Sequence, residues 1–215
     1  MNIFHRFTSW PTTPALKRYR VAKFKQRRQI LSRRHLRTLE HVQIGGCTGL
    51  SFEWISRHRR RPGERPEARV EFLNSDAAWT VINMFANFFN SAGRDVRAER
   101  ITRVAPNGCN MQCGSHVDED DFDTFAATLR HFDAHPGYHI VEIRFNQLMP
   151  NHLCALHVGI GGMTFFEPNS GEYSVAVGDR KAFLLALSAQ YATYVSPKGK
   201  STELTFRDVS FYHVG

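Results

Sequence analysis

Three residues that are far apart in the sequence have side chains that together could perform thiol-based acyl chemistry: Cys47, His152 and Glu167. A thiolate is a strong nucleophile, an imidazole can take up and return its proton, and a third group can hold the imidazole in one tautomer. Cys47 follows Gly45 and Gly46 and opens an apolar run, which predicts a helix. We therefore expect the thiol in the first helical turn, where the helix dipole lowers its pKa.

The histidine and the carboxylate belong to a predicted hairpin. Residues 152–158 have the pattern of a strand, residues 159–162 predict a turn, and residues 163–166 predict its partner strand. The separation of fifteen positions from His152 to Glu167 then brings the two side chains together from opposite arms.

Other residues compete for these roles or support them. His157 lies in the same strand, but its odd separation from His152 places it on the opposite face, so we favour His152. Asn169 is an alternative to Glu167 for orienting the imidazole. Fixed donors must also stabilise the negative charge on the attacked carbonyl oxygen, and we expect them to be the Cys47 backbone N–H and the Gln43 side-chain amide.

The elements around these residues predict an α+β fold, with a helical half first and an antiparallel sheet second. A turn-rich loop over residues 167–173 should display side chains at a strand end. The expected helices are 47–57, one that starts after an Asp76 cap, one that begins in the acidic run 118–123, and 179–190; the other expected strands are 138–145, 191–195 and 202–214.

The basic residues are concentrated at the N-terminus. Residues 1–40 contain eleven lysines and arginines against one glutamate, whereas the remaining 175 residues contain 17 basic and 19 acidic side chains. We therefore predict two parts: a basic, flexible leader over residues 1–40 and a folded domain over residues 41–215.

Within the leader, residues 16–39 lack proline and glycine and could form a basic amphipathic helix. Its positive charge suits an anionic membrane surface through residues 17–37, or a nucleic acid. A solvated or export-related tail is an equal alternative. The slightly acidic body has no nucleic-acid motif, which makes nucleic acid the less favoured partner.

The four cysteines indicate free thiols in a reducing compartment. Cys109, Cys113 and His116 resemble part of a zinc site, but a second close pair of ligands is missing, so we predict neither a metal nor a cofactor. The sequence has no apolar run long enough to span a bilayer and no secretory signal pattern, which argues against Sec-type export.

Three blocks of the sequence resemble the YopT/AvrPphB family of papain-like cysteine proteases, which bacteria deliver by type III secretion. The blocks are residues 46–51 with Trp54, the strand that begins at His152, and residues 165–173, and the similarity covers about residues 41 to 195. The resemblance implies that Cys47 is the nucleophile, His152 the general base and acid, and Glu167 the orienting residue. Glu167 departs from the family, where this position is an aspartate, which leaves three outcomes: Glu167 works from a slightly altered hairpin, Asn169 orients the imidazole instead, or the enzyme is impaired.

The resemblance also implies a function: a thiol protease that is delivered into host cells by a non-Sec route and cleaves specific host proteins. Lipid-anchored small GTPases and kinases are substrates of the family. Two alternatives stay open: a nucleic-acid-binding or membrane-binding protein that acts through the arginine-rich segment, and a Cys-His acyltransferase, since transfer and hydrolysis share one thioester intermediate.

Overall fold

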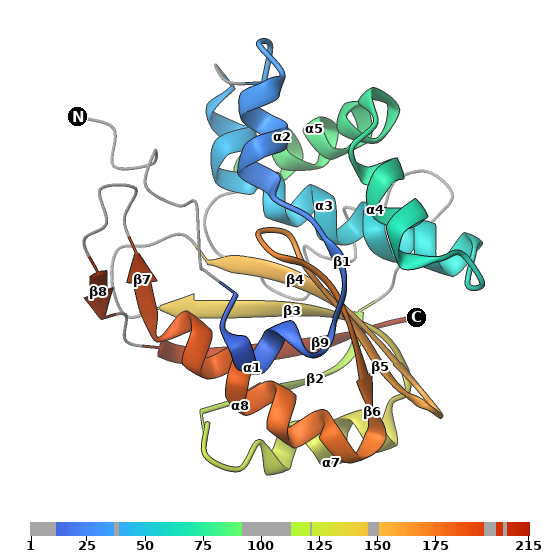
Figure 1. Cartoon of the computed structure of the whole chain (residues 1–215), viewed down its shortest axis with the longest axis vertical. Coiled ribbons are helices and arrows are strands. Elements are labelled where there is room, and N and C mark those ends of the chain that lie inside the picture. Colours follow the sequence, from blue (N-terminus) through green and yellow to red (C-terminus); the bar gives the residue numbers. More distant parts are fainter. Residues whose placement is uncertain are drawn as a thin grey trace.

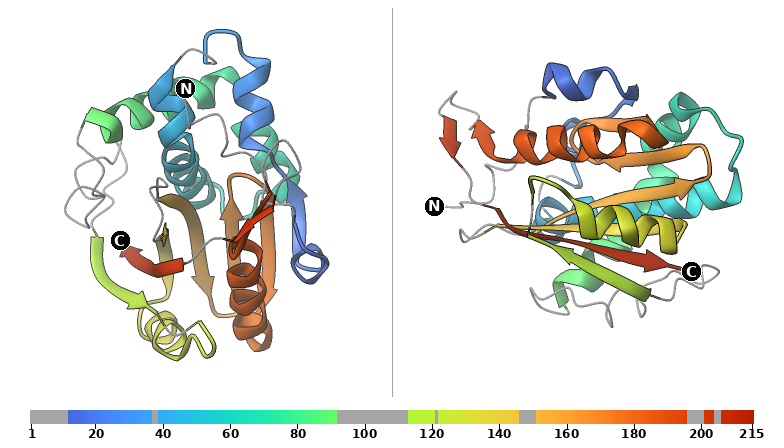
Figure 2. Two further views of the ribbon diagram at one scale, coloured as in Figure 1. Left: turned by 90° about the vertical axis from the view of Figure 1, so that its left-hand side faces the viewer. Right: turned by 90° about the horizontal axis from the view of Figure 1, so that it is seen from below.

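The computed structural model describes residues 12–36, 39–91, 113–120, 122–145, 151–195, 201–203 and 206–215. A seven-stranded antiparallel sheet lies between two helical layers (Figure 1). Helices α2 to α5 cover one face and helices α1, α7 and α8 the other, as the two turned views in Figure 2 also show. The predicted α+β class with a helical half on an antiparallel sheet is confirmed.

The sheet has the order β1-β6-β5-β4-β3-β9-β2, and each neighbouring pair is antiparallel. Its centre is the hairpin of β4 and β5, so the strands that carry His152 and Glu167 are paired on both sides. The strands are β1 Arg20–Lys23, β2 Cys113–Glu119, β3 Gly137–Phe145, β4 His152–Gly159, β5 Gly162–Glu167, β6 Gly171–Ala176 and β9 Phe206–Val214; β7 Thr193–Val195 and β8 Ser201–Glu203 form a separate pair.

Two apolar cores, one on each face of the sheet, hold the layers together. Alternate residues of β4 divide between them: Leu153 and Ala155 join the core under α3 and α5, whereas Cys154 and Leu156 join the core under α7 and α8. The helices are α1 Pro14–Lys17, α2 Gln26–Ser32, α3 Glu40–Arg60, α4 Pro66–Leu73, α5 Asp76–Ser91, α7 Ala126–Ala134 and α8 Arg180–Tyr191.

The helix that carries Cys47 is longer than the sequence predicts. α3 begins at Glu40, so Cys47 lies in its third turn and not in its first. The favourable effect of the helix dipole is confined to the first turn. The dipole explanation for a reactive Cys47 is therefore wrong, and any activation of the thiol must come from neighbouring side chains.

The expectation of a flexible leader ending at residue 40 is wrong for residues 12–36. Strand β1 pairs with β6 at the sheet edge, and helix α2 packs on α3. At this edge Gly171 has φ +126°, and an added Cβ would lie 2.0 Å from the Ala22 carbonyl oxygen, so only glycine fits. The segment is buried through Leu16, Tyr19, Ala22, Phe24, Ile30 and Leu36. This burial outweighs the charge pattern that suggested a tail.

Other predictions were partly correct. The hairpin and the helices at 76 and 180 are confirmed, but Ser75 caps α5 by accepting a hydrogen bond from Ala78 N–H. The acidic run does not start a helix, because Asp118 and Glu119 end strand β2. Strand β6 and helix α4 were not predicted. No helix among the described residues could cross a membrane.

Candidate active site

Helix α3 and strand β4 bring Cys47 and His152 together. The two elements are in direct contact, and the Ser51 hydroxyl, one turn after Cys47, donates a hydrogen bond to the Leu153 carbonyl at 3.1 Å. Cys47 and His152 are 5% and 6% exposed, so a small part of each side chain reaches solvent. The thiol and the imidazole interact, and each shifts the pKa of the other toward the charged pair.

The second contact of the imidazole is with Glu167. His152 Nε2 lies 2.7 Å from Glu167 Oε1, and Glu167 is fully buried at the end of β5. Asn169 reaches the same carboxylate through its backbone N–H, at 3.0 Å from Oε2. Of the two residues proposed to orient the imidazole, Glu167 is therefore the one whose side chain contacts the ring.

The longer side chain of Glu167 is held by the turn that follows it. The Ser170 hydroxyl donates to Glu167 Oε2 at 2.5 Å, and the Tyr173 hydroxyl donates to Ser170 Oγ at 2.6 Å. Burial and the charge of Glu167 raise the pKa of Tyr173 to about 12, so this tyrosine remains a donor at neutral pH. With Oε2 fixed in this way, Oε1 is directed at the imidazole.

The surroundings of Cys47 favour its thiolate. Burial by itself raises the pKa of Cys47, but the hydrogen bond and the charge of His152 outweigh burial and lower the pKa below its ordinary value. Hydrogen bonds from the Leu153 backbone and the Thr48 side chain act in the same direction. The imidazole therefore provides the activation that the helix dipole does not.

The same contacts favour a charged imidazole. Burial lowers the pKa of His152, but interactions with Cys154, Cys47 and Glu167 raise it well above its usual value. Burial raises the pKa of the Cys154 thiol, which is thus protonated at neutral pH. With Cys154 neutral, the groups that can favour the imidazolium are Cys47, as its thiolate, and Glu167.

Of the two predicted oxyanion donors, the Cys47 N–H is engaged in the helix, and the Gln43 side chain lies outside the described residues. In an α-helix the Cys47 N–H points toward the carbonyl of residue 43 and is occupied. A different glutamine, Gln26 at the start of α2, lies beside the nucleophile: its Nε2 would be 2.7 Å from a Cβ added to Gly46. Gly46 thus leaves room for the Gln26 amide, which would have to shift if the residue had a side chain.

Gln26 also contacts the turn that holds the catalytic candidates. Its backbone N–H donates to the Pro168 carbonyl at 2.8 Å, and its side-chain Oε1 is buried without a hydrogen-bond partner. Sequence reasoning missed this residue because it lies 21 positions before Cys47, in a segment that was expected to be flexible. No local sequence signal marks it.

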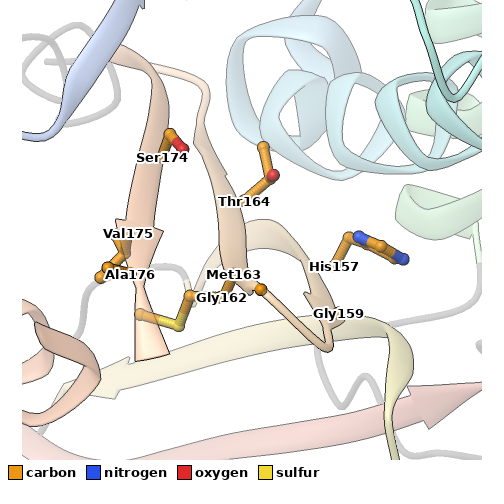
Figure 3. A pocket seen from close by; sticks show the side chains of 9 residues that line it. His157, Gly159, Gly162, Met163, Thr164, Ser174, Val175 and Ala176 are labelled. Atoms are coloured by element: carbon orange, nitrogen blue, oxygen red, sulfur yellow. The ribbon is translucent and has the colours of Figure 1, made fainter. Parts of the chain in front are cut away.

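His157 lies away from this site. It is five residues after His152 in β4, about 16 Å along the strand. Its ring contacts those of His58 and Tyr138, and burial and the charge of Arg69 lower its pKa. It also lines a cavity of about 360 Å³ around the β4–β5 turn, where the side chains of His157, Thr164 and Met163 are drawn in Figure 3.

Two residues from the sequence blocks around the candidate site join the helical half to the sheet. Trp54 Nε1 on α3 donates to Glu172 Oε2 on β6 at 2.7 Å. Arg69 on α4 donates to both oxygens of the same carboxylate, each at 2.9 Å, and all three side chains are buried. Glu172 thus fixes α3 and α4 on the strand next to β5.

A comparison with known structures identifies one with a similar fold. The crystal structure of the Pseudomonas avirulence protein AvrPphB matches with a TM-score of 0.61 and 16% sequence identity, over 93% of this chain and 99% of that one. The chain has the AvrPphB fold. The resemblance drawn from three sequence blocks is thereby confirmed at the level of the fold. No family model matches, and no curated protein matches the sequence.

Proposed function

We propose that the chain is a papain-like thiol protease in which Cys47 is the nucleophile, His152 the general base and acid, and Glu167 the orienting carboxylate. The observation that carries the proposal is the continuous set of contacts from the Cys47 thiol through the His152 ring to Glu167 Oε1. The AvrPphB fold supports it, because the two chains share nearly their whole length.

The chemistry follows from the protonation states. The Cys47 thiolate attacks a substrate carbonyl, the imidazolium gives its proton to the leaving amine, and a thioester remains. Neutral His152 then takes a proton from water, which hydrolyses the thioester and restores the pair. Glu167 stabilises the positive charge on the ring and fixes its tautomer.

We assign one oxyanion donor to Gln26. The carbonyl oxygen becomes negative when the thiolate attacks, and a preorganised N–H donor near the nucleophile lowers that barrier. The Gln26 amide lies against Gly46, the residue before Cys47, and its backbone is fixed to Pro168. It takes the role that the sequence suggested for Gln43.

The test of the catalytic assignment is covalent labelling with an epoxide warhead directed at thiol proteases. Wild-type protein should be labelled at Cys47, and Cys47→Ala and His152→Ala should each lose the label. His157→Ala is the matched control, because this histidine lies in the same strand and contacts none of the three residues. Labelling that survives His152→Ala but is lost in His157→Ala would contradict the assignment.

We further propose that the protease is a bacterial effector that acts in the host cell on specific proteins. The avirulence protein that shares the fold supports this role. Lipid-anchored small GTPases and kinases are the substrate classes to test first. Incubation of host-cell lysate with wild type and Cys47→Ala, followed by mass spectrometry of new termini, tests it. Cleavage by the Cys47→Ala variant would exclude this active site.

An anionic membrane surface remains the proposed location of action. Exposed residues on and next to β1 and α2 combine positive charge with apolar side chains: Val21, Lys23, Lys25, Arg28, Leu31 and Arg34. Lys23→Glu with Lys25→Glu and Arg28→Glu should weaken binding to phosphatidylserine vesicles without changing the melting temperature. Unchanged vesicle binding would remove the proposal.

Two alternatives have their own readouts. An acyltransferase would join the acyl part of the substrate to an added amine, which product mass distinguishes from hydrolysis. A nucleic-acid-binding protein would show salt-sensitive binding to polynucleotide that the triple charge reversal abolishes. Salt-sensitive binding with no labelling of Cys47 would favour the latter.

A further inference from the structure

A second thiol lies next to the imidazole of His152. Cys154 follows two residues later in β4, and side chains two residues apart in a strand share a face. Continuing the β4–β5 register by one residue beyond the pair of Ala155 and Phe166 places Glu167 opposite Cys154. A ligand atom of His152, the Cys154 sulfur and a Glu167 oxygen all lie within 4.8 Å of one another.

These three groups are typical ligands of zinc. Zn²⁺ binds imidazole nitrogen, thiolate sulfur and carboxylate oxygen at about 2.0–2.3 Å, so tetrahedral ligand atoms lie about 3.4 Å apart. The Nε2–Oε1 pair of His152 and Glu167, 2.7 Å apart, must therefore open slightly, and longer separations within the 4.8 Å cluster must close, which side-chain rotation can supply. Among the described residues, this is the one group of three such side chains close enough to hold a metal ion.

We propose that His152, Cys154 and Glu167 form an inhibitory zinc site. Zn²⁺ displaces the thiol proton of Cys154 and the ring proton on His152 Nε2, both of which pass to solvent, and replaces the hydrogen bond between His152 and Glu167. The metal then occupies the ring nitrogen and the carboxylate that orient the imidazole in the proposed mechanism, so His152 is withdrawn from its role beside Cys47. The inhibition rests on the proposed protease function, whereas the binding of zinc does not.

Zinc binding is tested in the absence of catalysis, with the Cys47→Ala protein and a chromophoric zinc chelator as competitor. One zinc ion per chain should bind, and adding Cys154→Ser should weaken its affinity at least tenfold. A Cys109→Ser and Cys113→Ser pair is the matched control, because these thiols offer a rival site, and it should leave the affinity unchanged. Equal affinity with and without Cys154 would overturn the proposal.

Cobalt and labelling provide independent readouts. Co²⁺ bound to Cys47→Ala should give a thiolate charge-transfer band that Cys154→Ser removes. Zinc should slow epoxide labelling of Cys47 in wild type. The Cys154→Ser variant should need at least a tenfold higher zinc concentration for the same relative slowing, where the labelling rate of each protein is compared with its own rate in the presence of chelator. Zinc that binds through Cys154 without slowing labelling would overturn the inhibition alone. Absence of epoxide labelling in chelator would count against the protease and leave the binding test intact.

Discussion

At the scale of single residues, the contacts of the imidazole decide which state of the nucleophile is present. Cys47 has a lowered pKa and His152 a raised one, although burial opposes both shifts. Both shifts favour the thiolate–imidazolium pair over the neutral thiol and imidazole. The unusual glutamate contributes to the raised pKa of His152, and its carboxylate is held on the ring by Ser170 and by the Asn169 backbone.

Glu167→Gln should therefore narrow the pH interval for epoxide labelling of Cys47. Loss of the carboxylate charge lowers the pKa of His152, so the alkaline limb of the pH–rate profile should move to lower pH. The maximal rate should fall by about tenfold or more. Glu167→Asp keeps the negative charge but has a shorter side chain. It should lower the maximal labelling rate while moving the alkaline limb of the pH–rate profile less than Glu167→Gln does. An unmoved limb in Glu167→Gln would contradict the role of the carboxylate.

Gln26→Ala should separate reactions that develop an oxyanion from those that do not. Acylation of Cys47 by an activated ester passes through an oxyanion and should slow by about 100-fold, as is usual for the loss of one such donor. Alkylation by iodoacetamide forms no oxyanion and should keep its rate. Measuring both rates on one protein preparation makes each the control for the other, and equal slowing would indicate a structural role instead.

At the scale of elements, the buried contact of Glu172 with Arg69 and Trp54 holds the nucleophile helix on the sheet. The carboxylate accepts two hydrogen bonds from the guanidinium of Arg69, which is 3% exposed. Removing one partner of a buried pair leaves an uncompensated charge, whereas pairs at the surface contribute little.

Glu172→Gln should consequently lower the free energy of unfolding by about 3–5 kcal/mol, measured by denaturant titration. Glu71→Gln, on the exposed face of α4, removes the same charge and should change stability by less than about 0.5 kcal/mol. Similar effects of the two substitutions would show that the bridge contributes no more than a surface carboxylate.

At the scale of the whole molecule, histidines gather on both faces of the sheet. His139 is fully buried among the rings of His131 and His213, and His58 stacks on Trp54. Burial, with neighbouring positive charge, lowers the pKa of both His139 and His58 to about 3. The fold therefore keeps these two rings neutral.

Stability should thus decrease on acidification. The unfolded chain protonates these histidines near pH 6.5, whereas the folded chain does so only near pH 3. The contribution of the two neutral rings to the free energy of unfolding is therefore fully present above about pH 6.5 and is lost as the pH falls toward 3. Thermal melts from pH 7 to pH 4 should show this, and His139→Gln should reduce the slope. His35→Gln, on the exposed surface, is the control. A melting temperature independent of pH would contradict the prediction.

Deletion of residues 1–36 should unfold the protein and not merely detach a tail. It removes edge strand β1 and the buried side chains of Leu16 and Phe24 from the two cores. Circular dichroism should show no cooperative melt. A cooperative melt near that of the full chain would restore the boundary at residue 40. Membrane binding is therefore better tested by the triple charge reversal at Lys23, Lys25 and Arg28 than by this deletion.

The sequence by itself determined the helix around Cys47, the hairpin from His152 to Glu167 and the α+β class, because periodicity and turn residues are local. The same local patterns gave the wrong start for α3 and the wrong state for residues 12–36. Only the tertiary structure revealed Gln26 against Gly46 and Cys154 beside His152. These proximities depend on how helices and strands that are distant in sequence pack together, which no local pattern encodes.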